Sequence, residues 1–232
     1  MAKKYAMIID LHNCVGCGAC DLACKSENNT PDGINWASHT TETYGTFPNV
    51  SYIHTPTLCN HCEDAPCVRV CPTKAMHKTE DGFVAHDPSI CIGCKSCMLA
   101  DPYGVIHFNK VDAFSEYASD TSSIVKGGTF SKKELSDKAN APFPYFNAAR
   151  GADGYEAIRG KGTVEKCTFC DHRVKEGQAP ACVVACPADA RIFGDMNDAK
   201  SELTQILKAN KPSVLLPEKG TKPKVFYIGE YN

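Results

Sequence analysis

The segment Cys14-Val-Gly-Cys17-Gly-Ala-Cys20-Asp-Leu-Ala-Cys24 decides the fold, because its cysteines follow one another at intervals of two, two and three residues. This spacing is typical of loops in which thiolates hold a cubane iron–sulfur cluster. Three thiolates so close together can surround one cluster, and the glycines between them let the backbone come near its sulfur atoms. The fourth cysteine of such a run can reach a second cluster. The segment therefore predicts a cluster-binding loop that leads into a short helix.

Four cysteine groups occur in the chain, which has 232 residues and 15 cysteines. The third repeats the intervals of two, two and three residues, whereas the second has intervals of two, four and three and the fourth has intervals of two, eleven and three. The second, third and fourth groups each end in a residue that precedes proline, as in Cys71-Pro72 and Cys186-Pro187. In the third group the last residue is Asp101, which stands where a sixteenth cysteine would complete the set. The groups are Cys14, Cys17, Cys20 and Cys24; Cys59, Cys62, Cys67 and Cys71; Cys91, Cys94, Cys97 and Asp101; and Cys167, Cys170, Cys182 and Cys186.

Disulfides and zinc are the alternative uses of so many cysteines. An odd number leaves one thiol over, and a chain of this length does not need disulfides in place of a core. Zinc sites use two Cys-x2-Cys pairs, and Cys167 and Cys170 with the later Cys182 could pass for half of a zinc ribbon. Runs of three closely spaced thiols do not suit zinc, so iron–sulfur clusters are the leading interpretation. Brown colour and iron content would separate it from a zinc protein.

The sequence around the cysteines repeats as well. Ile9-Asp10 before the first group aligns with His86-Asp87 before the third. Short apolar stretches before and after the groups predict strands. We expect them at residues 6–9, 75–76, 83–85, 105–108, 190–193 and 224–228, with a helix that Asp198 caps and that buries Leu203, Ile206 and Leu207. Residues 26–58 are polar and contain turn signals, so we interpret them as a connector.

The predicted fold class is α+β, with two loop-rich, ferredoxin-like cluster-binding domains, one inserted in the other. Only 19 residues separate Cys71 from Cys91, so the second and third groups form one compact unit, and by elimination the first and fourth groups pair. The predicted divisions are residues 1–55 plus 160–195 for one domain, 56–110 for the other, 111–159 for a surface insert, and 196–232 for a C-terminal helix and tail.

Exchange of the fourth ligand within each pair of groups would give four clusters. At least three are [4Fe-4S]. Three outcomes stay open at the Asp101 site: a carboxylate that holds a fourth iron, a [3Fe-4S] cluster, or water or another ligand at that corner. The predicted ligand sets are Cys14, Cys17, Cys20 and Cys186 for cluster 1; Cys167, Cys170, Cys182 and Cys24 for cluster 2; Cys59, Cys62, Cys67 and Asp101 for cluster 3; and Cys91, Cys94, Cys97 and Cys71 for cluster 4.

Charge and motif content exclude several other functions. The formal charge is −2, from 25 basic and 27 acidic residues, which argues against a nucleic-acid partner. No apolar run approaches the roughly 18 residues of a membrane span, and we find no export signal. No nucleotide-binding loop, nucleophile elbow or zinc-protease motif occurs, so we expect no catalytic residue on this chain. Basic residues near the cysteines, Lys25, Arg69, Lys74, Lys95, Lys166 and Arg173, would offset part of the cluster charge, although ordinary surface positions are the simpler expectation.

The residues around the cysteines resemble a known family, the electron-transfer (beta) subunits of dimethyl-sulfoxide-reductase-type molybdopterin oxidoreductases. The matching motifs cover most of residues 5–195. Segment 27–33 and the closing Lys224-Val-Phe-Tyr-Ile look most like the small subunit of respiratory arsenate reductases. The motifs are Cys14-Val-Gly-Cys-Gly-Ala-Cys20, Thr57-Leu-Cys-Asn-His-Cys62, Ala65-Pro-Cys67, Cys71-Pro-Thr73, Cys91-Ile-Gly-Cys94, Pro102-Tyr-Gly-Val105, Glu165-Lys-Cys-Thr-Phe-Cys-Asp-His172, Pro180-Ala-Cys182 and Ala185-Cys-Pro187.

The resemblance implies a large catalytic partner with a molybdenum or tungsten bis-pterin site. That partner would reduce an oxyanion or a sulfur compound, or act on a phenolic hydroxyl group. The domain with the first and fourth groups would face it, and electrons would pass through the other domain to or from a membrane-anchor subunit or a soluble donor. The family has cysteine where this chain has Asp101.

Two functions follow from these observations. The first is an electron-transfer subunit that connects such a catalytic subunit to a redox partner. The alternative is a free-standing polyferredoxin that docks with several enzymes. The long insert and the C-terminal tail favour the first, since a small carrier has no need of that extra surface. We expect assembly in the cytoplasm, where clusters are built, and a final site either there or, after export with a partner, on the outer face of the inner membrane.

Overall fold

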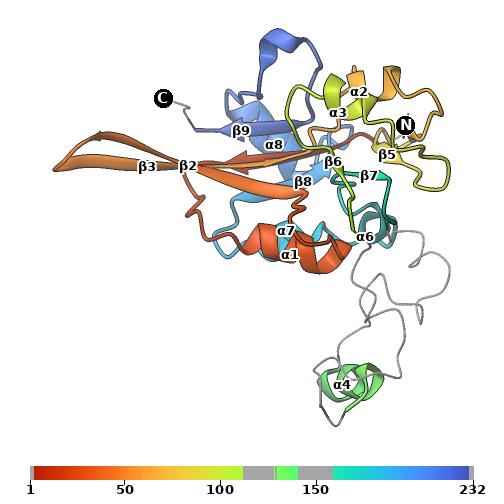
Figure 1. Ribbon diagram of the computed structural model, residues 1–232. Coiled ribbons are helices and arrows are strands. Elements are labelled where there is room, and N and C mark those ends of the chain that lie inside the picture. The colour runs from red at the N-terminus through yellow and green to blue at the C-terminus, as the bar shows by residue number, and fades with distance from the viewer. Residues whose placement is uncertain (1–2, 112–127, 129, 141–158, 230–232) are drawn as a thin grey trace.

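The computed structural model describes residues 3–111, 128, 130–140 and 159–229, and it mixes short helices with small sheets (Figure 1). The strands are β1 (Tyr5–Asp10), β2 (Ala37–Thr46), β3 (Asn49–Leu58), β4 (Met76–Lys78), β5 (Val84–His86), β6 (His107–Phe108), β7 (Val164–Glu165), β8 (Arg191–Asp195) and β9 (Val225–Ile228). The helices are α1 (Ala19–Asn28), α2 (Pro66–Arg69), α3 (Ser96–Ala100), α4 (Lys132–Ala139), α6 (Asp171–Lys175), α7 (Ala181–Val184), α8 (Glu202–Ala209) and the 3₁₀ turn Pro217–Lys219.

The central sheet has the strand order β8-β1-β9, with β8 antiparallel and β9 parallel to β1. Residues 6–9 of β1 are completely buried because the strand lies between two neighbours and is covered on both faces. Ile8 packs with Leu203 of α8 on one face, whereas Met7 and Ile9 pack on the other against the core that contains cysteines. The strands expected near residues 6–9, 190–193 and 224–228 are therefore confirmed.

Helix α8 confirms the expected amphipathic helix but begins later than predicted. Its N-cap is Ser201, whose hydroxyl accepts a hydrogen bond from the backbone N–H of Thr204 at 3.2 Å. Asp198 was the wrong residue for this role, because its carboxylate accepts from the N–H of Lys200 and closes a turn before the helix. Leu203 is buried as expected, with Ile206 and Leu207 packed beside it.

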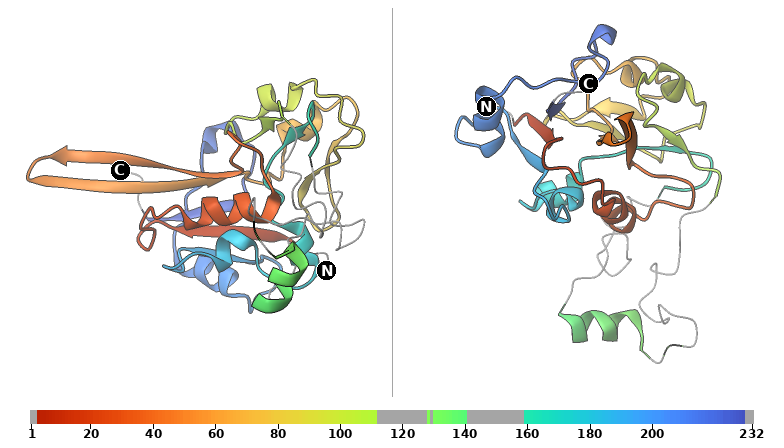
Figure 2. Two further views of the ribbon diagram at one scale, coloured as in Figure 1. Left: turned by 60° about the horizontal axis from the view of Figure 1, so that its bottom comes forward. Right: turned by 90° about the vertical axis from the view of Figure 1, so that its left-hand side faces the viewer.

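The interpretation of residues 26–58 as a connector is wrong for most of that segment. Strands β2 and β3 pair over their full length from Ala37 opposite Leu58 to Thr46 opposite Asn49. They form a hairpin that extends away from the other elements (Figure 2, left). The turn signal at Phe47-Pro48 was correct, since this is the hairpin turn. Both faces of the hairpin are largely exposed towards its tip, so the alternation of apolar and polar residues that marks a half-buried strand is absent.

Two smaller antiparallel strand pairs accompany the second and third cysteine groups. Strand β4 pairs with β5, and β6 pairs with β7 across the long segment between them. The strands expected at 75–76, 83–85 and 105–108 are thus present, although shorter or shifted by a residue. Most of the expected surface insert, 111–159, lies outside the described residues. Its described part contains α4, which begins with a capping box between Ser131 and Glu134.

Candidate iron–sulfur centres

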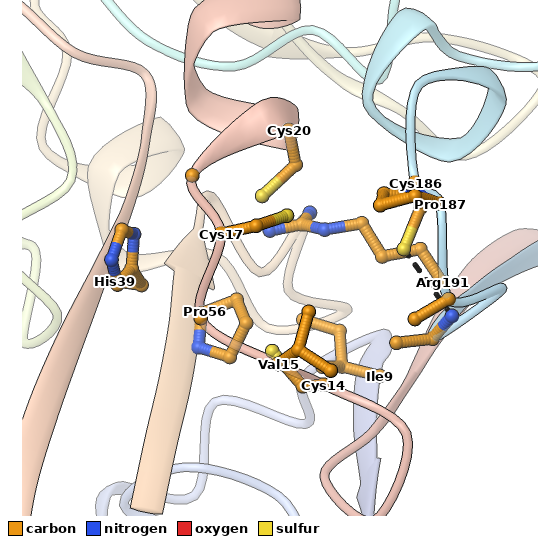
Figure 3. Close-up of a pocket in the computed structure, with 14 residues that line it drawn as sticks. Ile9, Cys14, Val15, Cys17, Cys20, His39, Pro56, Cys186, Pro187 and Arg191 are labelled. Carbon is orange, nitrogen blue, oxygen red and sulfur yellow. Dashed lines mark hydrogen bonds between the residues drawn. The ribbon is translucent and has the colours of Figure 1, made fainter.

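The first cysteine-lined cavity lies between the loop after β1 and the loop before β8. Cys14, Cys17, Cys20 and Cys186 line it, around about 410 Å³ of empty space. Figure 3 shows their sulfur atoms facing a common space. The distant Cys186 reaches this loop because β8 pairs with β1, which sets Arg191 opposite Ile9. The structure therefore brings together the residues that the sequence predicted for cluster 1.

Two further cavities have the same construction in the second and third groups. One is lined by Cys71, Cys91, Cys94 and Cys97, with about 290 Å³ of empty space. The other is lined by Cys59, Cys62, Cys67 and Asp101, with about 310 Å³. Each cavity takes three residues from one group and the last residue of the other group. The residues that the predicted exchange of ligands requires therefore lie together.

The remaining four cysteines, Cys24, Cys167, Cys170 and Cys182, are all buried. Burial raises the pKa of the Cys167 thiol most, and Cys24, Cys182 and Cys170 raise it further, as does Cys59 of another predicted set, so these thiols lie within electrostatic range of Cys167. Asn28 bridges two of them, because its amide Nδ2 lies 3.6 Å from Sγ of Cys24 and 3.9 Å from Sγ of Cys170. These are the residues predicted for cluster 2.

The electrostatics of these thiols fit a positively charged cluster core. Burial raises the pKa of Cys20 and Cys97 to about 11 and that of Cys67 and Cys170 to about 12. A buried thiolate without a cation is costly, so the ionised form that binds iron needs the positive charge of the metal. Backbone N–H groups also point at sulfur, as from Met76 to Cys71 at 3.4 Å. The donor set and its surroundings are therefore those of a thiolate-bound iron–sulfur cluster.

Asp101 occupies the place of a fourth thiolate in the third cavity. Its Oδ2 accepts a hydrogen bond from the N–H of Val105, four residues later, at 2.8 Å. The Sγ of Cys186 accepts in the same way from the N–H of Ala190, also four residues later, at 3.3 Å. A second carboxylate oxygen of Asp101 accepts from the N–H of Tyr103 at 3.2 Å. The Asp101 carboxylate and the Cys186 thiol are thus held in the same way, each at the edge of its cavity by a backbone N–H four residues later.

Two glycines of the cysteine loops lie in close contact with neighbouring residues. Gly16 and Gly93 both have a φ of +66°, a conformation that suits glycine. A Cβ atom at Gly16 would lie 2.3 Å from the ring of His54, and one at Gly93 would lie 2.1 Å from the carbonyl oxygen of Gly162. Neither position has room for a side chain.

The basic residues singled out in the sequence have different roles. Lys25 donates to the backbone oxygens of Pro31 and Ile34, at 2.8 and 3.2 Å, and so closes the turn after α1. Arg173 pairs with Glu27 at 3.2 Å. Lys166 is 1% exposed and donates to the carbonyls of Val84 and Cys167, which makes it a buried cation between cysteine groups. Arg69, Lys74 and Lys95 are exposed.

Sequence reasoning missed Arg191, a buried cation that lines the first cavity. It stands five residues after Cys186, and the residues five positions after Cys71 and Asp101 are Met76 and Ile106. Both line their own cavities. Aligning the repeats beyond the cysteines would have found it.

Together these cavities and the small sheets that hold them define an iron–sulfur electron-transfer protein. The family profile described as "4Fe-4S dicluster domain" matches residues 50–126 and 144–196. The chain belongs to this family and, within it, to the iron–sulfur subunits of reductases. No helix in the described ranges has both the length and the apolar character needed to cross a membrane.

Three relatives illustrate the similarity. The chain is 53% identical over 229 residues to the arsenate respiratory reductase iron–sulfur subunit ArrB of Shewanella sp. (strain ANA-3), covering 98% of this chain and 97% of that one. It is 37% identical to a putative iron–sulfur subunit of the dimethyl sulfoxide reductase of Halobacterium salinarum, covering 97% and 79%. It is 35% identical to one of the chains of the polysulfide reductase of Wolinella succinogenes, covering 98% and 95%.

Proposed function

We propose that this chain carries four iron–sulfur clusters and conducts electrons between a large molybdenum or tungsten bis-pterin subunit and a second redox partner. The observation that carries the proposal is the grouping of the predicted ligands. Three sets of four residues line three separate cavities, and the fourth set is buried together. Several one-electron centres in a small protein suit conduction rather than substrate turnover, so substrate chemistry would belong to the partner.

The ligand sets are those that the spacing predicted. Cluster 1 takes Cys14, Cys17, Cys20 and Cys186; cluster 2 takes Cys24, Cys167, Cys170 and Cys182; cluster 4 takes Cys71, Cys91, Cys94 and Cys97. Cluster 3 takes Cys59, Cys62 and Cys67, with Asp101 as the fourth ligand of a [4Fe-4S] cluster or as the neighbour of a [3Fe-4S] cluster. The position of the Asp101 carboxylate beside this cavity supports the first form.

The same grouping supports the predicted arrangement of one ferredoxin-like unit inserted in another. The outer unit comprises residues 1–55 and 160–195, and the inner unit comprises residues 56–110. The apolar residues divide in a similar way. One core contains Cys24, Cys167 and Cys182, and a second contains Cys62, Cys67 and Cys97, although Cys59 of the inner unit packs in the first core.

Exposed apolar side chains support docking at both ends of the cluster chain. Val15 and Leu22, beside cluster 1, are 62% and 70% exposed. Ile92 and Leu99, at the equivalent positions beside cluster 4, are 66% and 90% exposed. Apolar side chains in such positions mark surfaces that partners cover. The catalytic subunit would cover the cluster 1 side, and a membrane-anchor subunit or a soluble donor would meet the cluster 4 side.

The identity of 53% to a subunit of an arsenate respiratory reductase makes arsenate the first substrate to test on the partner. Reduction of another oxyanion or of a sulfur compound is the next to test, since the other relatives are subunits of such enzymes. We place cluster assembly in the cytoplasm, with a final site there or on the outer face of the inner membrane.

Anaerobic purification of this chain from its native cells tests the proposal. We expect a stoichiometric large subunit with molybdenum or tungsten, and about 16 irons on this chain, or about 15 if the Asp101 site holds three. A chain that carries iron but emerges alone in every buffer would favour the free polyferredoxin. A colourless chain that contains zinc would overturn both interpretations.

A further inference from the structure

Arg191 is a buried cation that no carboxylate among the described residues neutralises by direct contact. It is 3% exposed, and its side chain runs from β8 into the first cavity, toward Cys17 and Cys20 (Figure 3). The acid that acts on it most strongly is Asp21, which is bound instead to His39 at 2.6 Å. The Nη2 atom of Arg191 is buried without a hydrogen-bond partner among the described residues, and Nη1 donates to the sulfur of Met7 at 3.7 Å.

The guanidinium lies among the predicted ligands of one cluster. Arg191 lines the same cavity as Cys14, Cys17, Cys20 and Cys186, the four residues predicted for cluster 1. Its positive charge is therefore beside this site.

The other two cavities carry no charge at the equivalent position. The residue five positions after the last ligand is Met76 in one and Ile106 in the other, and both side chains are buried. Their cations stand elsewhere, since the exposed Lys95 lines the Met76 cavity and the buried Lys166 donates to the carbonyl of Val84 in the wall of the Ile106 cavity. Burial of an ion costs several kcal/mol unless an opposite charge offsets it. A cluster with four thiolates and a core of about 2+ carries a net charge of about −2, and reduction adds one more negative charge. An anion of this kind in the cavity would offset the cost of burying the guanidinium.

We propose that Arg191 raises the reduction potential of cluster 1 above the value that this cluster would have with an apolar side chain at this position. The inference rests on the proposed clusters. The physical cause is that a nearby positive charge stabilises the reduced cluster more than the oxidised one, because reduction makes the cluster more negative. The low dielectric of the buried site makes the effect larger than at the surface.

The test is an anaerobic redox titration of the cluster-loaded full chain, followed by electron paramagnetic resonance. Arg191→Met is the main variant, because methionine is what the sister cavity carries. We expect one of the four signals to become harder to reduce by at least tenfold in its equilibrium constant, which is about 59 mV for one electron. The other three should shift by less. Arg191→Lys, which retains the charge, should restore most of the shift.

The matched control is Arg69→Met, which removes an exposed arginine beside Cys67 and Cys71. Water screens that charge, so no signal should move. Four signals with unchanged potentials in Arg191→Met would overturn the inference and leave the clusters in place. If Arg191→Met does not load iron, Arg191→Gln is titrated under the same criteria. If neither variant loads iron, Arg191 has a structural role, and the inference that it sets the reduction potential is rejected. Failure of the wild-type chain to show four clusters would instead contradict the proposed function.

Discussion

Replacing Gly93 by alanine should destabilise the chain more than the same change at Gly104. The two residues share nearly the same backbone conformation, with φ values of +66° and +67°. Alanine at either position therefore has the same left-handed strain, about 1–2 kcal/mol. A Cβ atom at Gly104 meets nothing within 4 Å, whereas one at Gly93 would lie 2.1 Å from the carbonyl oxygen of Gly162. The difference between the two variants isolates this close contact.

The carbonyl of Gly162 cannot move aside easily. Gly162 donates its N–H to the carbonyl of Asn109 at 2.9 Å, and Asn109 donates its own N–H to the carbonyl of Thr163 at 2.9 Å. The amide of Asn109 donates in addition to the carbonyl of Arg159 at 2.8 Å. Crowding of this kind costs about 1–3 kcal/mol beyond the strain. Gly93→Ala should therefore cost about 1–3 kcal/mol more than Gly104→Ala.

The assay is anaerobic thermal unfolding together with the iron content of the purified chain. Each kcal/mol lowers the unfolding midpoint by roughly 2–4 °C in a chain of this size. We also expect Gly93→Ala to lose iron first from the site of Cys91 and Cys94, because Gly93 lies between these two ligands. Equal midpoints and equal iron in the two variants would refute the reasoning.

Three further changes probe other parts of the molecule. Asp101→Cys should complete an all-thiolate site, alter one of the four spectroscopic components and add up to one iron; four unaltered components would mean that Asp101 is not a ligand. Glu27→Ala removes the acceptor of bonds from His172 at 2.7 Å and Arg173 at 3.2 Å, which join α1 to α6. It should cost about 1–3 kcal/mol in a denaturant titration, and Glu27→Gln about half as much. Leu203→Ala empties a fully buried position under the central sheet and should lower the free energy of unfolding by about 2–5 kcal/mol, measured in the same way. An unchanged midpoint in either titration would contradict the packing described.

The cysteine spacing predicted most of the residues that line each cavity, because thiols separated by only two to four residues are held together by the local chain alone. The residue of each ligand set that is distant in sequence could be assigned only from a further observation. Cys186 reaches Cys14 only through the pairing of β1 with β8, and a short apolar strand does not name its partner. Elimination supplied that pairing here, because the second and third groups were close enough in sequence to satisfy each other.

The hairpin of β2 and β3 could not be predicted in the same way. Sequence patterns detect a strand by what it buries on one face, and this hairpin exposes both faces along most of its length. Its threonine and tyrosine content was the available signal, since these residues favour strands whatever they contact. The predicted start of α8 was wrong for a simpler reason. Asp198 and Ser201 are both good N-cap residues, and only the turn geometry distinguishes them.

Arg191 and Lys166 show a different limit. Composition treats every arginine and lysine as a surface charge, and most are. The burial of these two side chains follows from their positions near Cys186 and Cys167 in the repeats.

The sheet order β8-β1-β9 also determines when strand β1 can pair during synthesis of the chain. Strand β1 is made first, but both of its partners are made near the end, so residues 6–9 leave the ribosome as an apolar strand with two open edges. Unpaired strands of this kind promote aggregation. The residues around the cavities of the second and third groups, from Cys59 to Asp101, can meet long before Cys186 is synthesised. We therefore expect iron to be inserted there first, with Cys14 and Cys17 exposed to oxidation until the last strands arrive.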